Sequence, residues 1–103
     1  MRALALAIAM MVSGAATAAD RCLLVVDGRT YINGPCRISL SPGGSFQAAS
    51  KLYFADVQVT ASGRADGNWN EEPGARHAHT SLGELTRNDA CWTNSQAIVC
   101  AWR

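Results

Sequence analysis

Four cysteines limit the folds open to this chain of 103 residues more than any other feature of its sequence. Cys22, Cys36, Cys91 and Cys100 are too widely spaced to form the close Cys-x-x-Cys pairs of a zinc ribbon. In a small exported chain, four cysteines indicate two disulfides, although the cysteine count alone leaves several pairings open. The local sequence must therefore identify the partners.

The first residues predict that the chain is exported. Arg2 precedes the unbroken apolar run ALALAIAMMV, and the small residues SGAATAAD follow it. This order is typical of a secretory signal peptide, with an A-x-A cleavage pattern at residues 16–18. The run is shorter than the ~20 residues of a membrane-spanning helix. We therefore expect residues 1–18 to be a signal peptide and residues 19–103 to be one domain, periplasmic or secreted, with no transmembrane segment.

Charge and composition exclude several classes of function. Of nine Lys and Arg, Arg2 leaves with the signal peptide, so eight remain against eight Asp and Glu. Nucleic-acid binding needs clustered positive charge, which this balanced sequence lacks. No motif indicates a cofactor.

The C-terminal segment ACWTNSQAIVCAWR predicts a disulfide-linked hairpin. A tight turn at Ser95–Gln96 places Cys91 directly opposite Cys100. Opposed residues of an antiparallel pair lie about 4.5–5.5 Å apart at Cα, within disulfide range. In this register Trp102 shares a face with Cys100, and we expect that face to be the core.

The remaining cysteines, Cys22 and Cys36, form the second predicted bridge. A hairpin turn at Asp27–Gly28 places Cys22 opposite Asn33, so the chain has to fold back after Asn33 to bring Cys36 to Cys22. Closing a loop of this length is worth about 3 kcal/mol in the chain-entropy model.

Most other segments predict β-strands. CLLVVD is continuously apolar, RISLS and KLYFADVQVT alternate, NWN is a short candidate strand, and SPGGS and ASGRADG are turn-like. The prediction is a mainly β fold, a small antiparallel barrel or sandwich of six to eight short strands.

One short helical turn is also expected. Ser81 and Glu84 have the spacing of a capping box, and Leu82 and Leu85 lie three residues apart, as on one helix face. Gly83 disfavours a longer helix, so the turn should end near Asn88.

The two histidines, His77 and His79, support an alternative metal-binding hypothesis. In an extended segment both side chains point to the same side, and imidazole suits zinc, copper or nickel. A zinc site needs three or four protein ligands, however, and the sequence identifies no third one.

Enzyme activity is not expected. The sequence contains no G-x-S-x-G elbow and no phosphate-binding loop with its lysine, and both disulfides would remove the cysteine nucleophiles. A domain this small also leaves little room for an enclosed pocket of about 300 Å³ or more.

The longest stretch without a strand pattern, EEPGARHAH, is the candidate partner-binding loop. Long loops in compact domains are often functional, and tryptophan is frequent among interface hot spots. We therefore predict partner contacts at Trp69, Glu71, Glu72 and Arg76. An equally open interpretation is that Trp69 only covers the end of the core.

Finally, the motifs YFADV, DGNWN, HAH, LGELTR and CW…CAW resemble those of small exported bacterial proteins with two disulfides and no known function. The resemblance covers residues 22–103 and implies a periplasmic location, but no activity or ligand. The physical features of the sequence, the loop above all, lead us to expect a non-enzymatic binding protein that contacts a protein or cell-envelope partner. An inhibitor-like role fits this description, and the metal-binding protein and a purely structural envelope component are the alternatives.

Overall fold

The computed structural model describes residues 20–103, so the predicted signal peptide lies outside the described residues. These residues form nine antiparallel strands and one 3-10 turn, with no helix long and apolar enough to cross a membrane. The prediction of six to eight strands was therefore too low. The elements are β3 (Arg21–Val26), β4 (Arg29–Pro35), β5 (Arg37–Leu40), η2 (Pro42–Gly44), β6 (Phe46–Ala49), β7 (Phe54–Ala61), β8 (Arg64–Trp69), β9 (Thr80–Asn88), β10 (Cys91–Thr93) and β11 (Ala97–Trp102).

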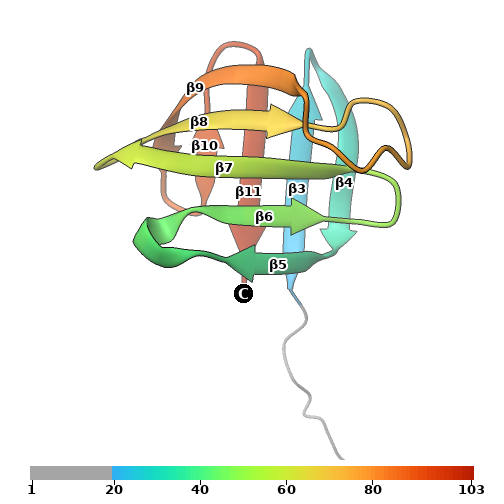
Figure 1. The fold of residues 1–103 in the computed structure, drawn as a ribbon, viewed down its shortest axis with the longest axis horizontal. Coiled ribbons are helices and arrows are strands. Elements are labelled where there is room, and N and C mark those ends of the chain that lie inside the picture. The colour runs from blue at the N-terminus through green and yellow to red at the C-terminus, as the bar shows by residue number, and fades with distance from the viewer. Residues whose placement is uncertain (1–19) are drawn as a thin grey trace, which may run out of the picture.

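The strands form a single, nearly closed barrel in the order β4-β3-β11-β10-β9-β8-β7-β6-β5. Strands β5 to β9 form one layer, and β4, β3, β11 and β10 cross behind them (Figure 1). Only Cys36 separates β4 from β5, so the chain turns a corner there from the rear layer to the front. The chain on either side of this corner is assigned to two strands, β4 and β5. This partly explains why the sequence predicted fewer strands.

Both predicted disulfides are present. Cys22–Cys36 ties the corner between β4 and β5 to β3, and Cys91–Cys100 links β10 to β11. The register Cys91↔Cys100, Trp92↔Val99, Thr93↔Ile98 is the predicted one. No cysteine among the described residues is free.

The expectation that Trp102 lies in the core was wrong. The core side of this hairpin is the face that carries Trp92 and Val99, which are 6% and 0% exposed, whereas Trp102 is 40% exposed. Both faces of β11 are apolar in sequence, so the register alone did not identify the inner one. Outside the barrel, the Arg21 guanidinium lies 5.9 Å from the Trp102 ring centroid.

The predicted helical turn at residues 81–88 is also wrong, because this segment is part of strand β9. A bulge opposite Gly67 and Asn68 adds one residue to β9, so Leu82 and Leu85 both face the core and are both 0% exposed. The three-residue spacing of the two buried leucines therefore arises here from a bulged strand and not from a helix. Gly83, at φ 83°, supplies the left-handed conformation that the bulge requires.

A second bulge shifts the register of the β3–β4 hairpin. Asp27 and Gly28 form the expected turn, but Leu24 pairs with Ile32 and Val25 with Thr30. Tyr31 is the extra residue, and Cys22 consequently faces Gly34 instead of Asn33.

The core lies between the two layers and consists mainly of aliphatic side chains together with Phe46, Trp69 and Trp92. It is packed tightly at Gly67, where an added Cβ would lie 2.6 Å from Leu85 Cδ1. Such an overlap would force the leucine to move, so this position in β8 requires glycine.

Candidate functional site

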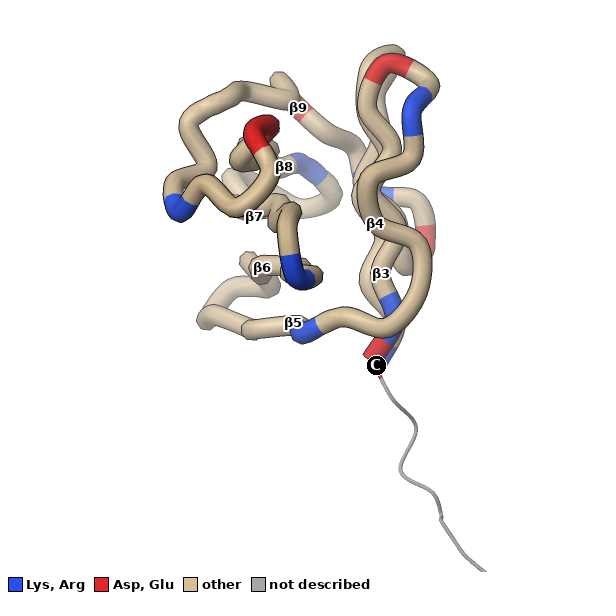
Figure 2. Tube along the Cα trace, turned by 90° about the vertical axis from the view of Figure 1, so that its right-hand side faces the viewer, with Lys and Arg blue, Asp and Glu red and all other residues tan. Residues whose placement is uncertain are grey.

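The predicted partner-binding loop follows β8 and leads into β9, at the right-hand end of the front layer in Figure 1. Its side chains are accessible: Glu71, Glu72, Arg76, His77 and His79 are all exposed. Figure 2 faces this end of the molecule and shows acidic and basic positions interspersed over it. The surface therefore carries both signs of charge and forms no extended positive or negative patch.

The backbone of this loop is held by a buried side chain, that of Asn70, which is 0% exposed. Its Oδ1 accepts a hydrogen bond from the Phe54 amide at 3.0 Å. Its Nδ2 lies within hydrogen-bond distance of three backbone carbonyl oxygens, those of Leu52 at 2.9 Å, Ala75 at 3.0 Å and Glu72 at 3.2 Å. One amide thus satisfies polar groups of two different loops, which would otherwise be costly to bury.

Further contacts close the base of the loop. The Gly74 amide donates to the Leu52 carbonyl at 2.9 Å, which joins the loop to the β6–β7 connection. Thr80 Oγ1 donates to Glu71 Oε1 at 3.0 Å, which joins the two ends of the loop. Glu71 itself lies at φ 46°, a left-handed conformation that directs the chain away from β8. The loop is therefore ordered by its own hydrogen bonds, while its charged side chains face solvent.

Beneath the loop lies an aromatic trio of Tyr31, Tyr53 and Trp69. The Tyr31 ring centroid is 4.6 Å from that of Trp69 and 5.0 Å from that of Tyr53, and Tyr53 and Trp69 are 6.1 Å apart. Aromatic rings at these distances attract one another beyond their burial alone. Trp69 is only 3% exposed, so it supports the loop from below, whereas the two tyrosines are half-buried. The Arg29 guanidinium lies 5.8 Å from the Tyr31 ring centroid.

The structure places the two histidines in the same loop. His79 Nδ1 lies 3.0 Å from the backbone oxygen of His77, and both residues are exposed. Within residues 20–103, no group of three or more His, Cys, Asp or Glu residues is arranged to hold a metal ion. The metal-binding hypothesis therefore gains no third ligand from the fold.

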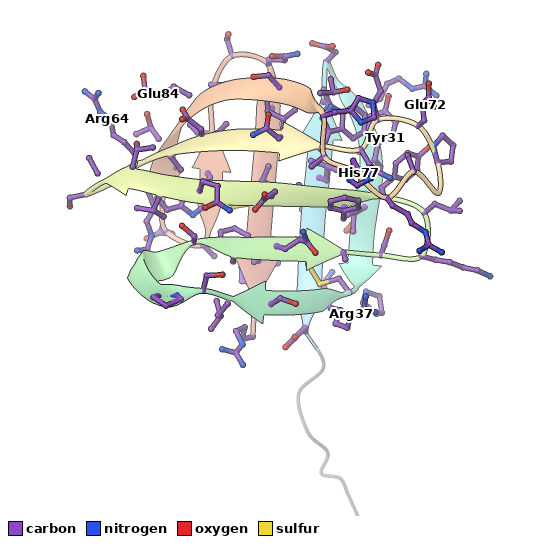
Figure 3. The ribbon with its side chains drawn as sticks, viewed as in Figure 1. Tyr31, Arg37, Arg64, Glu72, His77 and Glu84 are labelled. Carbon is purple, nitrogen blue, oxygen red and sulfur yellow. A yellow bond between two sulfur atoms is a disulfide. The ribbon has the colours of Figure 1, made fainter. Side chains whose placement is uncertain are left out.

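Sequence reasoning missed the residues that order the loop. Asn70 is adjacent to the predicted site, but its burial depends on the β6–β7 connection, which is distant in sequence and lies next to it in the fold. Tyr31 was missed because its orientation follows from the bulge in β4. Figure 3 shows Tyr31, Glu72 and His77 in the same upper right region of the molecule.

Comparisons of this chain with protein-family models, with curated proteins and with solved structures each give no match. The functional argument therefore depends on the geometry of the site.

Proposed function

We propose that this is a non-enzymatic exported binding protein that contacts a protein partner of the cell envelope through the loop of residues 70–79. The observation that carries the proposal is the combination of a backbone fixed by buried Asn70 with exposed Glu71, Glu72 and Arg76. A loop ordered before binding loses less conformational entropy when its partner arrives. Fixed charges of both signs favour a partner with complementary charges.

The half-buried tyrosines extend this proposed surface. Tyrosine is frequent among the residues that dominate binding energy, and Tyr31 and Tyr53 lie at the edge of the loop. Tyr31 contacts both buried Trp69 and Tyr53, so the three rings support one another. The two disulfides are compatible with an oxidising, extracytoplasmic location.

The test is affinity capture from an envelope extract with the oxidised, exported protein as bait. The loop variant is Glu71→Gln/Glu72→Gln/Arg76→Gln, which removes three exposed charges but keeps side-chain size. The matched control is Arg64→Gln/Glu84→Gln, which removes an exposed ion pair on β8 and β9, away from the loop. Figure 3 shows that pair at the opposite side of the front layer.

We expect one saturable partner that the wild type and the control retain, with binding to the loop variant at least tenfold weaker. Equal capture by all three proteins would overturn the assignment of the loop. Absence of any saturable partner would overturn the binding function itself.

The metal-binding alternative stays a prediction with its own readout. A ligand that binds only the native state stabilises it by about 4 kcal/mol at a thousandfold excess over Kd. A rise in melting temperature with zinc, copper or nickel that disappears in His77→Gln/His79→Gln would favour that alternative over a protein partner.

A further inference from the structure

A second feature of the molecule lies at the opposite end of the front layer, where the strands surround an unfilled space. This cavity is partly open to solvent and has a volume of about 370 Å³. It lies between η2, the β7–β8 turn, the β9–β10 turn and the end of β11 (Figure 1). Its apolar walls come from five different strands and consist of Ile38, Leu40, Phe46, Val59, Trp92 and Ala101.

Glycines in two turns line part of the cavity. Gly43, Gly44 and Gly63 line it and adopt φ angles of 83°, 89° and 73°, which disfavour any residue with a side chain. A Cβ built on Gly44 would lie 3.8 Å from Val59 Cγ2, and nothing lies within 4 Å of one built on Gly43 or Gly63. The turn geometry therefore disfavours side chains at these three positions of the cavity lining.

The inner and outer parts of the cavity differ in exposure. Phe46 and Trp92 are 7% and 6% exposed, whereas Leu40 on the outer part is 57% exposed. A volume of this size falls at the lower end of the range for small-molecule sites, about 300–1,000 Å³. The walls suit a single short acyl chain or an aromatic ring, and burial of such a group would remove apolar surface from water.

The charged residues at the cavity indicate the head group of the ligand. Arg87 and Arg103 line the cavity together with Asp89. Arg87 Nε donates to the Asp89 backbone oxygen at 3.0 Å, which orients the arginine. Within residues 20–103, the ion pair that forms joins Arg64 to Glu84, so the terminal nitrogens of Arg87 are not occupied by a carboxylate of the fold.

From this arrangement we propose that the cavity binds a small amphipathic monoanion, an acyl chain or aromatic ring that ends in one carboxylate. The apolar part lies against Phe46 and Trp92, and the carboxylate accepts hydrogen bonds from the Arg87 guanidinium, whose planar fork matches it. The Asp89 carboxylate at the same cavity disfavours a dianion. This binding site is separate from the loop of residues 70–79 and does not depend on a protein partner.

The test compares decanoate with decanol, which share a chain but differ in charge. Isothermal titration of the oxidised wild type, below the micelle concentration, should show decanoate binding at least tenfold more tightly than decanol. The Trp92 indole resonance should shift on addition of decanoate, and that of Trp69 should not. Equal affinity for both ligands would overturn the assignment of the head group, and binding of neither would overturn the site.

Two variants and a control locate the ligand. Arg87→Gln should weaken decanoate binding about tenfold or more, because a hydrogen bond to a charged group is lost. Val59→Phe should abolish binding of both ligands by filling the cavity, with a retained amide spectrum showing that the barrel is folded. Arg64→Gln, an exposed arginine already paired with Glu84, should bind decanoate like wild type. Equal loss in Arg64→Gln and Arg87→Gln would indicate general charge attraction and overturn the proposal.

Discussion

The two ends of the front layer are built from the same meander, but one end is filled and the other is open. At the loop end, Trp69 packs with Tyr31 and Tyr53 in an aromatic trio, and Asn70 satisfies the backbone of two connections. At the cavity end, Trp92 has a similar degree of burial but borders a space of about 370 Å³. The two ends also differ in their turns, since a long hydrogen-bonded loop covers the first end and short turns, two of which contain glycine, line the second.

The two proposed binding sites therefore lie at opposite ends of one small barrel. Side chains that fill one end stabilise the fold and fix a loop whose charges remain exposed. At the other end, the turn glycines contribute no side chains to the packing. The disulfide Cys91–Cys100 links the neighbouring strands β10 and β11. The following predictions test whether the two ends differ energetically as their packing suggests.

The largest expected effect is that of Trp69→Ala, set against Trp92→Ala. Removing a buried tryptophan costs about 3–5 kcal/mol, with the higher values at sites that cannot collapse. We expect Trp69→Ala near the top of this range and Trp92→Ala at least about 1 kcal/mol lower, because Trp92 already borders a cavity. Urea unfolding of the oxidised proteins measures the loss of unfolding free energy in each variant. If neither variant folds, Trp69→Phe and Trp92→Phe should show the same order, and a reversed order contradicts the comparison.

Removal of each disulfide is expected to give the next largest loss of unfolding free energy. Cys22–Cys36 spans 14 residues and Cys91–Cys100 spans 9, for which the chain-entropy model gives about 3 and about 2.6 kcal/mol. The corner at Cys36 has one backbone hydrogen bond, to the Asp20 carbonyl, whereas Trp92 and Val99 keep β10 and β11 paired. We therefore expect Cys22→Ala/Cys36→Ala to lower the free energy of unfolding more than Cys91→Ala/Cys100→Ala, as measured by denaturant titration. A larger loss from the Cys91–Cys100 pair would contradict this order.

Local pairing rules predicted several of these features correctly from sequence. The turn at Asp27–Gly28 and the Cys91↔Cys100 register both depend on residues close in the chain, where spacing fixes geometry. The mainly β class also follows from short alternating segments. These predictions needed no knowledge of how distant strands pack.

The incorrect predictions share a physical cause, because each depends on contacts between distant segments. The spacing of Leu82 and Leu85 matches a helix, and only pairing with β8 shows the bulge that places both leucines in the core. Which face of β11 lies in the core depends on the strands that pack against it. The prediction that placed Trp102 in the core was therefore wrong. For the candidate site, the exposed loop charges were accessible to sequence reasoning, whereas Asn70 and the cavity depend on the assembled barrel.

Loss of the Asn70 side chain tests how the loop end is held. Asn70→Ala leaves the Phe54 amide and the Leu52 and Ala75 carbonyls without this partner, and an unsatisfied buried group costs about 1–3 kcal/mol. We expect a loss of about 2–3 kcal/mol in unfolding free energy, with faster amide exchange in residues 70–79. Asn68→Ala, in the preceding strand β8 and half-buried, should change both quantities little. Unchanged exchange in Asn70→Ala would show that other contacts order the loop.

The smallest expected effect comes from the ion pair on the outside of β8 and β9. Arg64 Nη1 lies 3.2 Å from Glu84 Oε2, with side chains 63% and 58% exposed. Exposed pairs contribute little because water and salt screen them and two long side chains lose freedom, so Arg64→Gln should cost less than about 0.5 kcal/mol. A double-mutant cycle with Glu84→Gln, measured by urea unfolding at low and high salt, isolates the interaction. A coupling above about 1 kcal/mol that survives high salt would show that charges outside the barrel matter as much as the packing at its two ends.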